Sequence, residues 1–178
     1  MAAICVYCAS GPVPRRFLDL AAELGSALAA AGHTVVSGGG NVSMMGSLAT
    51  AARAAGGTTV GIIPGHLVAR EAADTDSDEL VITDTMRERK RLMEARADGF
   101  ITLPGGIGTL EELFETWTGG FLGEHDKPVV LLDADGFYQP LLRWFDSLRD
   151  DGFVAAAAMD RLQVTGSVAD AVTLVTQQ

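Results

Sequence analysis

The feature that most constrains the fold of this chain is a regular alternation of short apolar runs with longer amphipathic segments. Strand-length apolar runs occur at 2–7, 34–36, 58–63, 80–83, 99–103, 128–132 and 162–165. Helical periodicity occurs at 15–31, 43–55, 85–97, 107–121, 138–150 and 167–176. This alternation is typical of a parallel sheet with crossover helices, and strands that are apolar throughout predict helices on both faces. We therefore predict a single Rossmann-like, doubly wound α/β domain spanning residues 1–178.

The composition agrees with one acidic globular domain. The chain has 178 residues, a hydrophobic content of 48% and a formal net charge of −10, and no Pro/Ser linker or repeat interrupts the alternation. A general nucleic-acid or membrane-surface binder needs a basic face, which this charge disfavours. We therefore expect neither partner, and an anionic ligand must be held by a local positive cluster.

The amino-terminal sequence and the lack of a long apolar stretch predict a cytoplasmic protein. The first ten residues contain no basic region, and no stretch of about 18 apolar residues occurs in the chain. Cys5 and Cys8 are the only cysteines, and in a strand their side chains point to opposite faces. We interpret them as a buried structural pair rather than a disulfide or a metal site.

The longest connection, residues 64–79, is polar and acidic. A connection of this length within a compact domain is usually functional or mobile. Its spaced carboxylates suggest calcium, but an EF-hand requires glycine where Glu79 stands and glutamate where Thr85 stands. We therefore reject calcium binding here.

Two glycine-rich loops follow predicted strands, at residues 37–46 and 104–108. Glycine lets backbone N–H groups converge on an anion at a helix amino terminus. Neither loop fits the P-loop pattern, and no G-x-G-x-x-G follows the first strand, so a nucleotide triphosphatase and a dinucleotide dehydrogenase are poorly supported. One such loop is commonly a tight turn, but two on one sheet favour a mononucleotide or a phosphorylated sugar.

The segment 86–96 concentrates basic residues on a predicted helix. Helical spacing places Met86, Arg89 and Met93 on one face, whereas Arg87 and Arg91 point elsewhere. We interpret the last two as solvated. Arg89 lies on an apolar stripe, where a guanidinium usually has a purpose.

The second glycine loop leads directly into carboxylates, and the two features have a joint explanation. Amides of residues 105–109 would bind a phosphate, and Glu112, about one turn later, would face the attached sugar. A carboxylate beside a ribose C1′ stabilises an oxocarbenium-like state and can activate water, which suggests glycosidic bond cleavage. The alternative is that the acidic residues only provide favourable charge near a helix amino terminus.

These residues resemble a known family. Residues 104–112, PGGIGTLEE, fit the P-G-G-x-G-T-x-x-E motif of the LOG ("Lonely guy") family, cytokinin riboside 5′-monophosphate phosphoribohydrolases that are often mislabelled as lysine decarboxylases. The first strand, the glycine triplet, the M-x-x-R-K segment 86–90 and residues 125–132 extend the similarity over nearly the whole chain. The resemblance implies a Rossmann-like homodimer that hydrolyses N6-modified adenosine monophosphates to the free base and ribose 5-phosphate. No His/Cys cluster or carboxylate cage for a catalytic metal is visible in the sequence, and hydrolysis needs no cofactor, so we expect neither.

The resemblance also assigns site residues. It implies that Arg89 and Glu112 form the catalytic pair. The implied substrate-binding residues are Glu71, Lys90, Gly105, Gly106, Ile107, Gly108, Thr109, Leu110, Glu111 and Thr118.

The sequence departs from the family pattern at two places. Arg87 replaces a histidine that many members have, so we assign it no role. The glycine triplet continues as SMMG at 43–46 rather than G-L-M-G, which leaves the ligand contacts of the Gly38–Gly40 loop open.

Two other functions stay open, and a third is disfavoured. One is a broader nucleoside 5′-monophosphate hydrolase acting on AMP, and the other is a binding module that carries a nucleotide-like cofactor without chemistry. Retention of Arg89 and Glu112 speaks against the binding module. The chain has only two lysines, Lys90 and Lys127, and neither has a recognisable pyridoxal phosphate signature, which disfavours a lysine decarboxylase.

Overall fold

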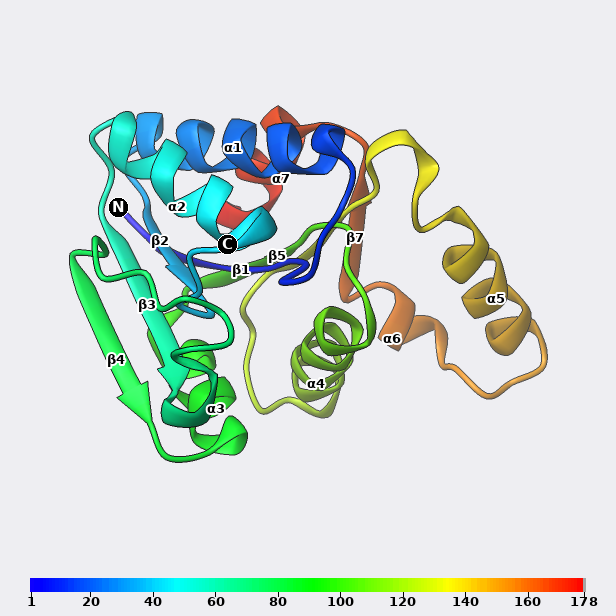
Figure 1. The fold of residues 1–178 in the computed structure, drawn as a ribbon. Helices are drawn as coiled ribbons and strands as arrows, with labels where there is room; N and C mark the ends of the chain where they lie inside the picture. The colour runs from blue at the N-terminus through cyan, green and yellow to red at the C-terminus, as the bar shows by residue number, and fades with distance from the viewer. Residues whose placement is uncertain (178) are drawn as a thin grey trace.

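Seven parallel strands form one sheet in the computed structural model, which describes residues 1–177 (Figure 1). The strands are β1 (Ala3–Tyr7), β2 (Thr34–Ser37), β3 (Thr59–Pro64), β4 (Glu79–Thr83), β5 (Gly99–Thr102), β6 (Val129–Leu132) and β7 (Leu162–Thr165). Their order across the sheet is β4-β3-β2-β1-β5-β6-β7. Each predicted apolar run is a strand, and the predicted doubly wound parallel sheet is confirmed.

Helices cover both faces of this sheet (Figure 1). One face packs against α1 (Arg15–Ala30), α2 (Ser43–Ala54) and α7 (Val168–Thr176). The other packs against α3 (Met86–Arg96), α4 (Ile107–Leu122) and α5 (Gln139–Asp150). The sequence analysis missed η1 (Gly65–Leu67), η2 (Ala134–Gly136) and α6 (Ala156–Met159), because such short segments carry no helical periodicity.

Local sequence signals explain where several helices begin and end. The side chain of Thr85 accepts a hydrogen bond from the Glu88 amide at the start of α3, and Ser167 caps α7 in the same way. Helix α4 ends at Gly123, whose φ of 81° is the left-handed conformation that glycine adopts readily.

The change of winding direction falls between β1 and β5. These strands are hydrogen-bonded neighbours, with Tyr7 opposite Thr102. The chain leaves β1 for α1 on one face and leaves β5 for α4 on the other face. Ligands of open α/β sheets bind in the crevice at such a point, beyond the carboxyl ends of the strands.

The two cysteines are buried free thiols on opposite faces of the sheet. Cys5 belongs to the core beneath α3 to α5, and Cys8 to the core beneath α1, α2 and α7. The interpretation as a buried structural pair is therefore confirmed.

The acidic connection after β3 uses its carboxylates internally. Asp74 is buried and accepts a hydrogen bond from Nη1 of Arg53 over 2.7 Å. Asp78 accepts a hydrogen bond from the amide of Thr59 over 2.8 Å. Asp74 also holds the segment against the glycine triplet, because its amide donates to the main-chain oxygen of Gly39 over 2.8 Å.

Two further features of residues 1–177 concern membranes and metals. None of the described helices is both long and apolar enough to cross a membrane. Within the same residues, no group of three or more His, Cys, Asp or Glu side chains is arranged to hold a metal ion.

Candidate active site

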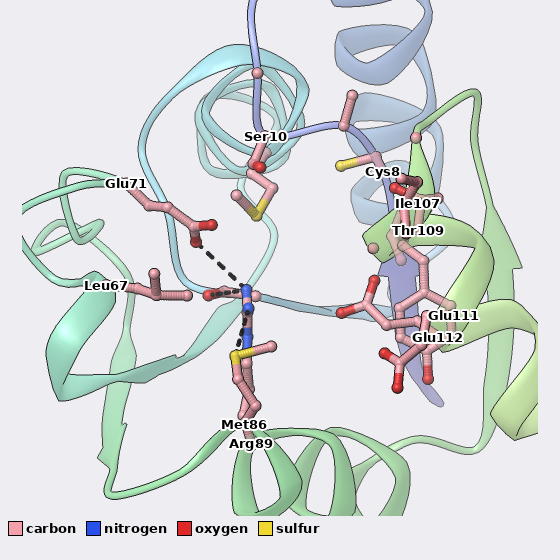
Figure 2. Close-up of a pocket in the computed structure, with 18 of the residues that line it drawn as sticks. Cys8, Ser10, Leu67, Glu71, Met86, Arg89, Ile107, Thr109, Glu111 and Glu112 are labelled. Carbon is pink, nitrogen blue, oxygen red and sulfur yellow. Dashed lines mark hydrogen bonds and ion pairs between the residues drawn. The ribbon is translucent and has the colours of Figure 1, made fainter.

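A pocket of about 430 Å³ lies at the crevice between β1 and β5 (Figure 2). Its walls come from the end of β1 with the following loop, the glycine triplet, the connection after β3, helix α3 and the start of α4. Among the predicted site residues, the pocket brings together Glu71, Arg89, Gly106, Ile107, Gly108, Thr109, Glu111 and Glu112. Segments far apart in the sequence therefore meet at one site.

Arg89 is buried on α3, with only 5% of its surface exposed. Its Nε donates to the main-chain oxygen of Ile62 over 3.1 Å, and its Nη2 donates to that of Gly38 over 2.8 Å. Among residues 1–177, the hydrogen-bond partner of its Nη1 is the soft Sδ of Met86, at 3.8 Å. Nη1 is therefore the nitrogen best placed to serve a substrate.

The predicted face of α3 is confirmed for Arg89 and Met93, whereas Met86 is 37% exposed at the border of the pocket. Met93 is buried with Arg89, whereas Arg87 and Arg91 are exposed. The solvated interpretation of the last two is correct.

Glu71 faces Arg89 from the acidic connection (Figure 2). Its Oε2 lies 3.5 Å from Nη2 of Arg89, and 13% of its side chain is exposed. This buried oxygen has no hydrogen-bond partner among residues 1–177. A buried carboxylate oxygen in this state is suited to accept a hydrogen bond from a ligand.

Glu112 lies across the pocket from Arg89, on α4 (Figure 2). Burial raises the pKa of Glu112 to about 7, and the nearby Arg89 opposes the shift. A carboxyl group with this pKa changes its charge near neutral pH, as a group that handles protons must.

The amino terminus of α4 is open to the pocket. The first hydrogen bond of the helix runs from the amide of Leu110 to the oxygen of Gly106, over 3.0 Å. The preceding amides therefore have no partner within the helix, and no side chain caps them. A Cβ at Gly106 or Gly108 would meet no atom within 4 Å. An uncapped helix amino terminus beside open space is suited to bind an anion.

Four predicted residues lie outside the lining of this pocket. Lys90 reaches from α3 to α4, where its Nζ pairs with Glu111 and lies 2.8 Å from Oε2 of Glu115. Gly105 packs against the side chain of Thr109, which leaves no room for a Cβ. Leu110 packs against the core beneath α3 to α5. Thr118 is exposed and borders a separate groove.

Tyr7 and Cys8 line the pocket but are unsuited to act as nucleophiles. Burial raises the pKa of both the Tyr7 phenol and the Cys8 thiol. The phenol also hydrogen-bonds Thr116 over 2.9 Å. Both groups therefore stay neutral at physiological pH.

Sequence reasoning missed part of the lining, and most of these residues carry no local signal. The missed residues are Val6 to Val13, Leu67, Met86 and Met93, whereas Gly38 and Met45 belong to the glycine-rich loop 37–46 that the sequence indicated. The segment after β1 could have been found from the rule that ligands bind where winding reverses, but only once the strand order was known.

The sheet order and this pocket define the class of protein: a doubly wound, Rossmann-like α/β protein with a pocket where the winding direction changes. Comparisons identify the family. Residues 45–175 match the family described as "Possible lysine decarboxylase". The chain belongs to this family, which is also called the LOG family. Members that are similar to this chain are named cytokinin riboside 5′-monophosphate phosphoribohydrolases.

Three similar proteins illustrate the relationship. The cytokinin riboside 5′-monophosphate phosphoribohydrolase of Mycobacterium tuberculosis is 56% identical over 168 residues, covering 94% of this chain and 90% of the relative. The enzyme of the same name, LOG, from Oryza sativa subsp. japonica is 44% identical over 87% of this chain and 64% of the relative. The molybdenum cofactor carrier protein of Chlamydomonas reinhardtii has a similar structure, with a TM-score of 0.73 and 25% identity over 99% of this chain and 96% of the other.

Proposed function

We propose that the protein hydrolyses the N-glycosidic bond of N6-modified adenosine 5′-monophosphates, releasing the free base and ribose 5-phosphate. The observation that carries this proposal is the arrangement of the α4 amino terminus, Arg89 and Glu112 around one pocket. Relatives that are 56% and 44% identical carry names for this activity.

The geometry supports a separate role for each of three groups in the pocket. The open amides before Leu110 bind the 5′-phosphate. The carboxylate of Glu112 stabilises positive charge developing at C1′ and orients or deprotonates the attacking water. Arg89 uses Nη1 to hold a substrate oxygen or to polarise the departing group.

The experiment that tests this function compares isopentenyladenosine with its 5′-monophosphate. The net charge of −10 repels anions at long range, so the phosphate is accepted only where local amides and a cation outweigh this field. Binding energy from the phosphate can then position C1′, so the nucleoside should lose kcat as well as affinity. Free base is measured by chromatography at matched concentrations, and equal kcat/KM values for the two would refute the proposal.

Two other activities are outcomes of the same assay with a wider substrate set. AMP turned over as fast as isopentenyl-AMP, with GMP and CMP as references, would indicate a general nucleoside monophosphate hydrolase. Binding without base release would indicate a carrier, the role stated in the name of the Chlamydomonas protein. The higher identity of the hydrolase relatives favours hydrolysis.

The positions of the lysines favour hydrolysis over decarboxylation. Lys90 pairs with two carboxylates on α4, and Nζ of Lys127 donates to the main-chain oxygen of Glu94 over 2.7 Å. Neither lysine lines the described pocket, so neither is placed to form a Schiff base there.

We further propose that the protein forms a homodimer and is located in the cytoplasm. A groove of about 620 Å³ between α4, α5 and α6 is lined mostly by apolar side chains, with Trp144 53% and Phe153 80% exposed. Exposed apolar patches mark protein interfaces, and a second copy on this groove would cover Thr118 as well. The free thiols Cys5 and Cys8 suit a reducing compartment.

A further inference from the structure

We propose that the glycine triplet Gly38–Gly40 is a positioning element for Arg89 and controls turnover through this arginine rather than by contacting the phosphate. The inference rests on the proposed hydrolase function. Only Gly38 of the triplet lines the pocket, and each glycine adjoins a different partner of the guanidinium.

Gly38 contacts the guanidinium directly. Its main-chain oxygen accepts the hydrogen bond from Nη2 of Arg89 over 2.8 Å. A Cβ at this position would overlap Nη2 and lie 2.9 Å from Cζ. Since Arg89 is buried and its Nε is tied to Ile62, the guanidinium could yield only by losing these bonds.

Gly39 supports the second partner, Ile62. Its φ of 74° is in the left-handed region that favours glycine, and a Cβ would lie 2.9 Å from the Ile62 amide nitrogen. The oxygen of the same Ile62 accepts the hydrogen bond from Nε of Arg89. A larger residue at position 39 would therefore move the strand that holds Nε.

Gly40 supports the third partner, Glu71. A Cβ at residue 40 would lie 3.2 Å from both Cβ and the main-chain oxygen of Glu71. The next amide, that of Asn41, donates to this oxygen over 3.1 Å. The carboxylate of Glu71 in turn faces Nη2 of Arg89.

The triplet therefore supports Arg89 in three ways: Gly38 contacts it directly, and Gly39 and Gly40 support its partners Ile62 and Glu71. Glycine is needed at these three positions because the Arg89 guanidinium, Ile62 and Glu71 lie too close for a side chain. The amides of the triplet need not hold an anion. By contrast, Gly106 and Gly108 of the second glycine loop face open space. The two glycine loops consequently have different tasks at one site.

The test uses Gly38→Ala, Arg89→Ala and the double variant, with Gly65→Ala as the matched control. Gly65 lies outside the pocket, and its Cβ would meet only ordinary contacts at 3.8 and 3.9 Å. We expect Gly38→Ala to lower kcat for isopentenyl-AMP roughly a hundredfold, the effect of displacing a catalytic group by about 1 Å. Gly65→Ala should keep wild-type kcat.

The urea concentration at the unfolding midpoint shows whether glycine is needed at position 38 because of Arg89 or because of the backbone turn itself. Gly38→Ala should lower the midpoint in the wild-type background and have little effect in the Arg89→Ala background, because Nη2 and Cζ of Arg89 are then absent and the remaining close neighbour is the flexible Sδ of Met45 at 3.1 Å. Recovery of soluble protein only in the Arg89→Ala background would support the proposal equally. Equal destabilisation in both backgrounds, or wild-type kcat for Gly38→Ala, would overturn it.

Gly40→Ala is a milder second variant, because its closest neighbour is the flexible end of Met45 at 2.7 Å. It should lower kcat while KM changes within about threefold, as expected when transition-state stabilisation rather than uniform binding is lost. An increase in KM alone would indicate a phosphate contact and refute the positioning role. If Arg89→Ala itself retains wild-type kcat, the proposed function fails instead, so the two failures are distinguishable.

Discussion

The phenolic oxygen of Tyr138 donates a hydrogen bond to the main-chain oxygen of Leu103 over 2.8 Å. Tyr138 directly precedes α5, and Leu103 directly follows β5 and begins the loop that leads into α4. Both residues are buried. This bond therefore anchors the start of the second glycine loop to a neighbouring element.

Tyr138→Phe should destabilise the protein and weaken substrate binding. The substitution leaves the buried oxygen of Leu103 without its donor, which costs about 1–3 kcal/mol in the free energy of unfolding. Urea unfolding and KM for isopentenyl-AMP measure the two effects. Thr173→Val, which removes an exposed hydroxyl, is the control and should be nearly neutral. An unchanged KM would show that the loop holds its conformation without this bond.

Arg89→Lys should damage activity although the charge is kept. A lysine cannot donate to Ile62 and Gly38 in the forked geometry of the guanidinium. We expect kcat/KM to fall by about 10² or more, the order of loss seen when an electrostatic donor is removed from an active site. Arg87→Ala, on the exposed side of α3, should retain activity, and a larger loss from Arg87→Ala would show that the wrong face was chosen.

Glu112→Gln should keep the fold and lose turnover. Glutamine preserves the shape but removes the negative charge that stabilises the oxocarbenium-like state, a loss of about 10² to 10³ in kcat. Base release and circular dichroism measure the two quantities. Wild-type kcat in the variant would remove Glu112 from the mechanism.

The pH dependence of kcat should reveal the ionisation of Glu112. Burial raises its pKa from an ordinary 4.5 to about 7, and the proposed mechanism requires the carboxylate. In the wild type, kcat should therefore increase as the pH rises through about 7, and Glu112→Gln should lack this dependence. The substrate phosphate, which titrates near 6, affects both proteins equally and serves as the internal reference.

The same ionisation should appear in the stability. Between pH 4.5 and about 7 the folded protein keeps a proton on Glu112 that the unfolded chain releases. The contribution of this group to the free energy of unfolding therefore falls as the pH rises through this window. The difference in free energy of unfolding between Glu112→Gln and the wild type should therefore favour the variant more at pH 8 than at pH 4. If the free energies of the two proteins change in parallel with pH, the pKa shift of Glu112 is contradicted.

A dimer through the apolar groove should be disrupted by Phe153→Asp. This side chain is 80% exposed in the single chain, so an aspartate there would remain in water in the monomer. In the dimer its charge would be buried at the interface, which destabilises the association. Light scattering should give twice the chain mass of 18.6 kDa for the wild type and a lower mass for the variant. A wild-type mass of 18.6 kDa at micromolar concentration would exclude the dimer.

The sequence by itself determined the elements and the identity of the chemical groups. Apolar runs and helical periods predicted seven strands and the six long helices, because burial on a sheet face or helix stripe imposes a period on the residues. The stripe Met86, Arg89 and Met93 marked Arg89 as buried for the same reason. Residues 104–112 marked the second glycine loop and Glu112 as a candidate site, because glycines directly before a helix leave amides at its amino terminus that can bind an anion.

Only the tertiary structure decided which segments meet. The strand order places β1 beside β5 and so brings Tyr7 and Cys8 to Glu112. The three oxygen partners of Arg89 come from the glycine triplet, β3 and the acidic connection. Contacts between segments this far apart depend on sheet order and close packing, which leave no periodic trace in the sequence.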